Sequence, residues 1–299
     1  MAEALRLPID GVDLSTTLRT LTFLRRDPCV RLAPGRFERA TITPQGVGAL
    51  TATWTPGDAQ VEVTTTGDGA PWLADRAAGL LGVADDASGF EPGDGRLREL
   101  WRRHRGDRIV RTSTLWHDAA WFIVQQRITT ADAADQWRRL VEELGVPVEG
   151  SDLVAPPEPS TVGRLRYTDL HRFGIERRRA EHLIGAARAL ARRHDLVDEP
   201  WEQVGPKLAT IRGVGPWTLG CLATQTWGEA DEVILGDDGI PSIISWLLAR
   251  ERRGDDERMV ELLEPYRPHR YRVLRLAMAA GVRPPRRSPR GHRTDIRRR

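Results

Sequence analysis

The stretch that decides the fold reads Leu208-Ala209-Thr210-Ile211-Arg212-Gly213-Val214-Gly215-Pro216-Trp217-Thr218, a Gly-x-Gly turn between two segments with helical apolar spacing. Glycine permits a positive φ and a close backbone approach, and proline suits the first turn of a helix. The stretch therefore predicts helix, tight turn, helix. The exposed amides at the start of the second helix, with Arg212 beside them, can hold a phosphate. An ordinary two-helix corner is the alternative.

Two adjacent carboxylates follow about twenty residues later, in Val233-Ile234-Leu235-Gly236-Asp237-Asp238-Gly239-Ile240-Pro241. The apolar run before them and the proline after them put both aspartates near the start of another helix. Each of them is a candidate helix cap.

Residues 1–86 have the pattern of a small α+β domain. Apolar and polar residues alternate in three Thr- and Val-rich stretches separated by Pro/Gly turns, which predicts an antiparallel meander. The strands are expected at Arg36–Thr43, Ala49–Thr55 and Gln60–Thr66. Helices are expected on either side, at Leu14–Leu24, capped by Ser15 or Thr16, and at Trp72–Leu81.

Residues 87–95 are rich in Gly, Pro, Asp and Ser and predict a linker. Residues 96–280 then predict an all-α domain, because apolar residues recur there at spacings of three and four. The Pro156-Pro157-Glu158-Pro159 stretch is expected to be a loop. The expected helices are Leu97–His104, Leu115–Gln126, Thr130–Leu144, Tyr167–Leu170, Arg177–His194, Trp201–Ile211, Trp217–Thr226, Ser242–Arg250, Asp256–Glu264 and Arg270–Ala280.

Composition excludes several classes of protein. The 299 residues contain no apolar run near the roughly 20 needed to cross a bilayer, and the N-terminus lacks signal-peptide order, so we expect a cytosolic protein with no membrane partner. The two cysteines, Cys29 and Cys221, are too few for an iron-sulfur cluster or a structural zinc site and are expected to be buried thiols. Residues 281–299 hold eight arginines and one aspartate. This basic tail is either a phosphate-binding arm or a solubilising segment.

Several motifs together resemble the helix-hairpin-helix DNA glycosylase superfamily. The hairpin and the aspartate about twenty residues later resemble its signature, and Ile123-Val124-Gln125-Gln126-Arg127-Ile128-Thr129 looks like its Gln-Gln helix end beside the flipped-out nucleotide. Phe173-Gly174-Ile175 resembles the approach to the hairpin, and Pro265-Tyr266-Arg267-Pro268-His269-Arg270 resembles a stretch of the alkylpurine branch, that of the inducible 3-methyladenine glycosylases. The resemblance covers about residues 97–280.

The resemblance implies a role for each matching position. Asp237 would be the catalytic carboxylate, with Asp238 as second choice, since the family places an apolar residue three positions on, where Ile240 stands. Base flipping leaves a gap in the stack; Gln126, with Arg127 and Ile128 as neighbours, would fill it, although Arg127 could equally contact a phosphate. The DNA-backbone contacts expected of the hairpin are Arg212, Gly213, Val214, Gly215 and Thr218.

A base pocket is expected to contain Trp217, Trp121 and His269, with the π face of Trp217 against an electron-poor base. A core tryptophan is the alternative for Trp217, and packing is the alternative for Trp121. No organic cofactor is expected; the resemblance implies a monovalent cation held by backbone carbonyls of Arg212, Gly213 and Gly215.

The expected activity is hydrolysis of the N-glycosidic bond of damaged, alkylated purines in double-stranded DNA by a monomer. Bifunctional relatives place a Schiff-base lysine where this chain has Trp217, and Lys207 is the only lysine, so no lyase activity is expected. Asp238 and Gly239 depart from the family pattern, where an aromatic residue and a histidine are common. The alternatives are a non-catalytic DNA-binding protein and a glycosylase for oxidised or deaminated bases.

Overall fold

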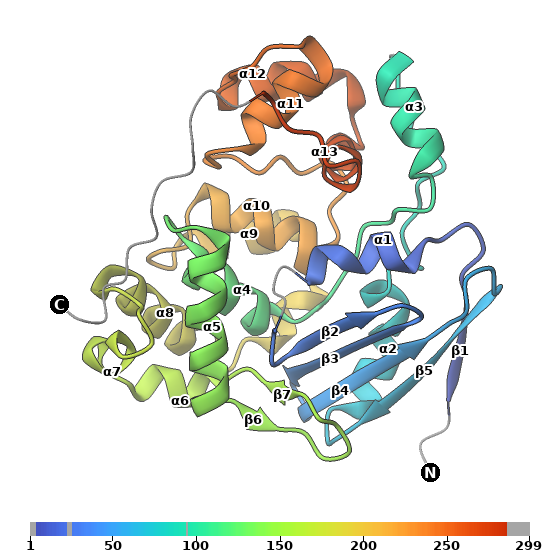
Figure 1. Cartoon of the computed structure of the whole chain (residues 1–299). Helices are drawn as coiled ribbons and strands as arrows, with labels where there is room; N and C mark the ends of the chain where they lie inside the picture. The colour runs from blue at the N-terminus through green and yellow to red at the C-terminus, as the bar shows by residue number, and fades with distance from the viewer. Residues whose placement is uncertain (1–3, 23–25, 94, 286–299) are drawn as a thin grey trace.

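The computed structural model describes residues 4–22, 26–93 and 95–285. It begins with a five-stranded antiparallel sheet in the order β1-β5-β4-β3-β2 (Figure 1). The strands are β1 Leu5–Pro8, β2 Val30–Ala33, β3 Arg36–Thr43, β4 Gly46–Thr53 and β5 Gln60–Thr66. The predicted meander is confirmed as the centre of this sheet. The sequence pattern missed the two edge strands, which are only four residues long.

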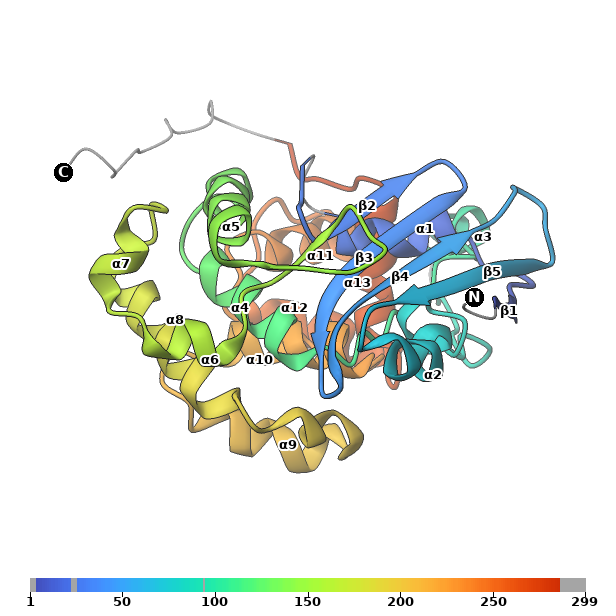
Figure 2. The same ribbon diagram turned by 90° about the horizontal axis from the view of Figure 1, so that it is seen from below.

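Two helices belong to this N-terminal part. Helix α1 (Leu14–Leu18) is shorter than predicted, and its first turn is capped by Asp13, whose carboxylate accepts from the Thr16 amide at 3.1 Å. The predicted cap at Ser15 or Thr16 was wrong by two or three residues, because Asp13 already satisfies the amide of Thr16. Helix α2 (Ala70–Leu80) packs against β4 and β5 (Figure 2).

The rest of the chain is helical apart from one small sheet, which confirms the predicted fold class. Strands β6 (Val146–Pro147) and β7 (Val154–Ala155) pair with each other, and β7 lies against β3. Helix α6 begins at Pro159, inside the stretch expected to be a loop, because proline tolerates the first turn of a helix. The helices are α3 Gly95–Arg103, α4 Leu115–Gln125, α5 Thr130–Leu144, α6 Pro159–Arg164, α7 Tyr167–His171, α8 Arg177–Leu190, α9 Trp201–Ala209, α10 Pro216–Leu222, α11 Ile240–Ala249, α12 Asp256–Leu263 and α13 Arg270–Ala279.

Helix α4 is the centre of the molecule. Its residues 115–124 are all buried, so it has no solvent face, and it contacts α5, α8, α10 and β3 (Figure 1). The buried apolar residues of the sheet and of the helices form one continuous core from Ile9 to Val282. The division into domains at 1–86 and 96–280 is based on the change in sequence pattern, and it stays a prediction.

A buried ion pair joins the sheet to α4. The Arg39 guanidinium on β3 donates to the Asp118 carboxylate on α4 at 2.9 Å, and the two side chains are 3% and 1% exposed. Asp118 also accepts from Gln225 at 2.9 Å, from Thr226 at 2.8 Å and from Thr112. A buried charge pair is tolerated when further hydrogen bonds of this kind satisfy the remaining lone pairs.

Replacement of Asp118 by alanine is expected to lower the free energy of unfolding by about 3–5 kcal/mol, because it leaves the Arg39 charge buried without a partner. Urea denaturation of wild type and Asp118→Ala measures the difference. Glu142→Gln is the control: it breaks the exposed Arg138–Glu142 pair on α5 and should change stability by less than about 1 kcal/mol. Equal stability of Asp118→Ala and wild type would contradict the assigned role of the buried pair.

Candidate functional site

The predicted hairpin is present between α9 and α10, and its two glycines differ. Gly213 has φ +95°, and a Cβ there would lie 2.3 Å from Cγ of His182. Gly215 is extended, with φ −94° and ψ −176°, and a Cβ there would meet nothing within 4 Å. Position 213 therefore requires glycine both for its positive φ and for the space beside His182. The sequence pattern alone does not distinguish Gly213 from Gly215.

Arg212 and Gly215 are the most exposed of the predicted hairpin contacts. Arg212 makes no ion pair with any described residue, so its charge is available to a ligand. Val214 and Thr218 are buried, unlike Arg212 and Gly215, and their contacts with DNA stay a prediction. The Val214 amide donates to the Ile211 carbonyl at 2.9 Å, and Thr218 is 1% exposed, so both act within the turn.

Gln126 ends α4 and reaches into the hairpin. Its Nε2 donates to the carbonyl oxygen of Gly213 at 2.7 Å and to the Thr218 hydroxyl at 2.9 Å. The structure thus places Gln126 as an internal support, with its amide already engaged. Arg127, the next residue, is exposed and has φ +58°, and Ile128 is half-buried against the core. Of the three residues expected to enter the stack, Arg127 is the one on the surface.

Asp237 is held by three hydrogen bonds immediately before α11. Its Oδ1 accepts from the amides of Gly239 at 2.8 Å and Ile240 at 2.9 Å, and its Oδ2 accepts from Nε1 of Trp217 at 2.9 Å. Asp238 is exposed and has no hydrogen bond to a described residue. The carboxylate of Asp237 is thus fixed in direction at a helix start, whereas that of Asp238 is not.

Trp217 lies between α4 and the Asp237 loop. Besides the hydrogen bond to Asp237, its ring makes an edge-to-face contact with Phe122, with centroids 6.0 Å apart and planes at 86°. Phe122, which the sequence analysis missed, is the aromatic residue of α4 on the Trp217 side. Nothing in the sequence distinguishes it from its neighbour Trp121, because both belong to an apolar run.

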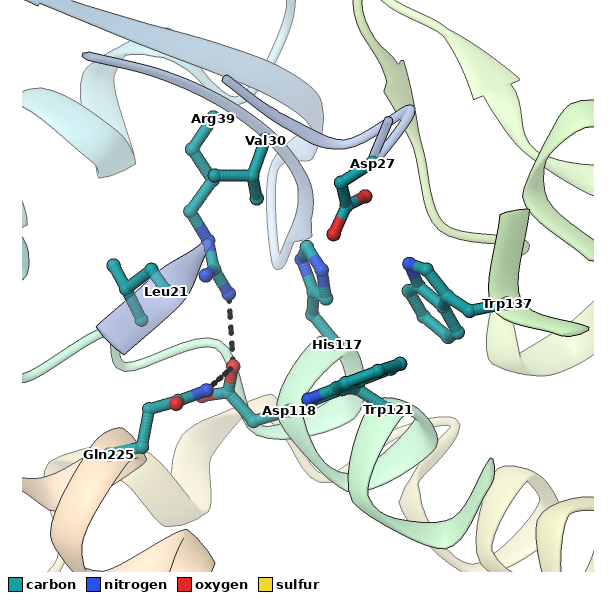
Figure 3. Close-up of a pocket in the computed structure, with 9 residues that line it drawn as sticks. All are labelled: Leu21, Asp27, Val30, Arg39, His117, Asp118, Trp121, Trp137 and Gln225. Atoms are coloured by element: carbon teal, nitrogen blue, oxygen red, sulfur yellow. Dashed lines mark hydrogen bonds and ion pairs between the residues drawn. The ribbon is translucent and has the colours of Figure 1, made fainter. Parts of the chain in front are cut away.

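The structure places Trp121 and His269 against other aromatic residues than Trp217, and the base pocket of these three residues stays a prediction. Trp121 lines a separate pocket against Trp137, with centroids 5.9 Å apart (Figure 3). His269 packs edge-to-face on Phe90, with centroids 6.0 Å apart. The physical reason is helical geometry: adjacent residues such as Trp121 and Phe122 point about 100° apart around the axis.

The pocket beside Trp121 is small, with a cavity volume of about 20 Å³. Figure 3 shows Asp27, Arg39, His117 and Trp137 around it. Burial raises the pKa of Asp27 to about 6, although the Cys29 amide donates to its Oδ1 at 2.8 Å. Burial, together with the Arg39 charge, lowers the pKa of His117 well below its usual range. This is a buried polar cluster between the sheet and the helices.

The described residues contain no preformed group of side chains that could bind a metal ion. In residues 4–22, 26–93 and 95–285, no three His, Cys, Asp or Glu side chains are grouped as metal ligands. Cys29 and Cys221 are both buried, as expected. The carbonyls of Gly213 and Gly215, expected to hold a monovalent cation, already accept from Gln126 and from the Leu219 amide at 2.9 Å. A carbonyl has a second lone pair, so the cation site stays a prediction.

Within the described residues, no helix has the length and apolar character that a membrane span requires. The basic tail lies almost entirely outside the described residues, which end at Pro285.

Comparison with known proteins gives one family and several relatives. The family model described as HhH-GPD superfamily base excision DNA repair protein matches residues 120–268, about half of the chain. A DNA-3-methyladenine glycosylase of Bacillus subtilis is 27% identical over 185 residues, covering 58% of this chain and 59% of that protein. A second, putative DNA-3-methyladenine glycosylase of the same organism is 24% identical, with 61% of its length covered. The chain thus spans about three fifths of the length of these curated relatives.

Solved structures share the fold over nearly the whole chain. A 3-methyladenine DNA glycosylase of Archaeoglobus fulgidus aligns with a TM-score of 0.76 and 19% identity, covering 92% of this chain and 97% of that one. An 8-oxoguanine glycosylase/lyase of Clostridium acetobutylicum, in complex with double-stranded DNA, aligns with a TM-score of 0.70 and 12% identity, covering 94% and 97%. At these identities the likeness concerns the fold, including the N-terminal sheet, which the family model does not reach.

Gly213→Ala is expected to destabilise the protein by at least about 2 kcal/mol, because the residue needs a positive φ and the new Cβ overlaps His182. Gly215→Ala is the matched control and should stay within about 1 kcal/mol of wild type. Thermal unfolding of the three proteins measures both effects. A Gly213→Ala variant as stable as Gly215→Ala would contradict the geometry of the turn.

Asp27 is expected to make stability depend on pH. Its pKa is raised from an unfolded value of about 4 to about 6, so the folded protein holds the proton more tightly. The stabilising contribution of the protonated acid is fully present below pH 4 and is lost as the pH rises through 6. Urea denaturation between pH 4 and 7.5 should show wild type losing stability relative to Asp27→Asn over that window. A difference that does not change with pH would contradict the raised pKa.

Proposed function

Because the chain belongs to the HhH-GPD superfamily of base excision DNA repair proteins, we propose that it is a DNA glycosylase that hydrolyses the N-glycosidic bond of alkylated purines. The observation that carries the proposal is the carboxylate of Asp237, fixed by the Trp217 indole and two backbone amides beside an exposed hairpin. The names of the Bacillus subtilis relatives support alkylated purines as substrates.

Asp237 would stabilise the charge that builds on the sugar. Cleavage of an N-glycosidic bond passes through a transition state with positive charge on the deoxyribose, and a preoriented carboxylate lowers its energy. The three hydrogen bonds hold Asp237 in one orientation, so the carboxylate needs no reorganisation during the reaction. Oδ1 already accepts two hydrogen bonds, whereas Oδ2 accepts one and keeps a lone pair that can accept from the attacking water.

The hairpin would hold the DNA backbone. Arg212 is exposed without an ion partner among the described residues, and the amides of the first turn of α10 have no helical acceptor, so both can contact a phosphate. Arg127 lies at the neighbouring α4–α5 turn and would enter the stack from which the damaged base is flipped. The arginine-rich tail would add contacts independent of sequence.

The side chains near the hairpin favour hydrolysis without strand cleavage. A lyase needs an amine that can form a Schiff base, and Trp217 stands at the position that the resemblance assigns to that lysine. Lys207 pairs with Glu199 at the start of α9, and this ion pair engages its ammonium group away from Asp237.

Asp237→Asn is expected to lower the rate of base release by at least about 100-fold, because the amide removes the negative charge opposite the sugar. Asp238→Asn should stay within about threefold of wild type, since Asp238 is exposed and unbound. Release of 3-methyladenine and 7-methylguanine from methylated DNA, under single-turnover conditions, measures all three proteins.

Two controls make this experiment decisive. Thermal unfolding of each variant shows whether the substitution affects only the chemistry. Borohydride added during the reaction should trap no covalent adduct with DNA, and a trapped adduct would contradict hydrolysis without lyase activity. Equal rates for wild type and Asp237→Asn would remove Asp237 as the catalyst. Salt-sensitive binding with no release on a panel of alkylated, oxidised and deaminated bases would favour a non-catalytic DNA-binding protein.

A further inference from the structure

Gln126 connects three segments that are far apart in the sequence. Its side chain contacts Gly213 and Thr218, 87 and 92 residues later, and its Oε1 lies 3.3 Å from Nδ1 of His182 on α8, 56 residues later. It is also the residue at which α4 ends, with φ −55° and ψ 129°. One side chain thus ties the end of the central helix to both sides of the hairpin turn.

The partners of Gln126 fix the orientation of its amide. The Gly213 carbonyl can only accept a hydrogen bond, so the NH₂ group must face the hairpin and Oε1 must face His182. His182 therefore carries a proton on Nδ1. Burial, together with the charges of Arg178 and Arg212, lowers the pKa of His182, which favours the neutral ring with that tautomer. Neither a carboxylate nor an apolar side chain can reproduce these contacts.

The anchored residue directly precedes the turn that carries Arg127. Arg127 adopts φ +58° and is exposed, so the chain reverses direction immediately after Gln126. His182 fills the space beside Gly213, which prevents the hairpin from moving toward α8 without breaking this packing. The position of Arg127 relative to the hairpin is therefore set through the Gln126 amide.

We propose that Gln126 is a positioning residue that couples the phosphate-binding hairpin to the turn that inserts Arg127 into DNA. Gln126 itself does not enter the stack. When the hairpin holds a phosphate, the amide fixes Arg127 at the distance needed to occupy the space of the flipped nucleotide. This coupling rests on the proposed function, because it concerns how the hairpin and Arg127 act on the same DNA.

A positioning role for Gln126 predicts different effects on two measurable quantities, the affinity for DNA and the extent of base flipping. Backbone binding comes from the hairpin and the arginines, so loss of the Gln126 amide should leave affinity for DNA nearly unchanged. Insertion of Arg127 and flipping of the base should become rarer, because the turn is no longer held. A residue that only stabilised the fold would lower protein stability and affinity without this separation.

The experiment compares Gln126→Leu with Gln125→Leu. Gln125 is adjacent and has the same side chain, but among the described residues its amide bonds only the Thr130 hydroxyl, at 3.3 Å. Each protein is titrated into DNA that carries a stable abasic analogue next to 2-aminopurine, whose fluorescence rises when it unstacks. Single-turnover release of 3-methyladenine is measured in parallel. Gln126→Leu should bind within about threefold of wild type but lose at least about tenfold in release rate and most of the fluorescence change. Gln125→Leu should match wild type.

Two further variants cover the case in which Gln126→Leu fails to fold. Gln126→Glu keeps the length of the side chain and removes the donors, so it should behave like Gln126→Leu. Thr218→Val removes one acceptor and keeps the Gly213 contact, so it should show a smaller loss in the same direction. Thermal unfolding of each variant separates these effects from loss of stability.

The outcomes distinguish this proposal from the enzymatic one. Unchanged fluorescence and release in Gln126→Leu, or equal losses in Gln125→Leu, would overturn the coupling. Wild type that unstacks 2-aminopurine but releases no base would contradict the glycosylase activity alone, and the fluorescence of the variants would still decide the coupling. Wild type that binds DNA without unstacking it would overturn the coupling as well.

Discussion

The hydrogen-bonded ion pair between Arg39 and Asp118 is the interaction on which the remaining geometry depends. Its two charges are almost completely buried, so the lone pairs of Asp118 must be satisfied. The partners of Asp118 come from three segments: β3, the segment just before α4, and the π-helical turn Ala223–Trp227 after α10. A buried charge cannot shift by an ångström without losing a partner. The pair therefore fixes where the sheet, the central helix and the end of the hairpin helix meet.

Helix α4 links the buried ion pair to the candidate site. Near its beginning Asp118 fixes it to the sheet, one turn later Phe122 contacts the Trp217 ring, and at its end Gln126 holds the hairpin. Because α4 is buried on all sides, no loop motion is available to adjust one contact without the others. The position of the candidate carboxylate, of the hairpin and of the Arg127 turn is thus set by contacts with a single buried helix.

The sequence predicted those parts of the site whose signal is local. The hairpin follows from Gly213, Gly215 and Pro216, and the placement of Asp237 before a helix follows from the residues around it. The neighbours of Trp121 and His269 could not be predicted, because no local pattern says which face of a packed helix meets which neighbour. The Gln126 contacts were equally out of reach, since their partners lie 56 to 92 residues away.

The hydrogen bonds of Asp237 have both a structural role and a role in the proposed chemistry. Its Oδ1 accepts from the amides of Gly239, the residue before α11, and of Ile240, the first residue of α11, so the same bonds shape the turn that leads into the helix. The bonds that hold the carboxylate in one orientation therefore also fix the backbone just before α11. The hydrogen bond from the Trp217 indole then fixes the position of Oδ2. Asp238 carries the same charge one residue later, yet it lacks both contacts, so it has neither the fixed orientation nor the structural reason to keep it. What separates the two aspartates is thus the hydrogen bonding of the backbone and of Trp217, and not their residue type.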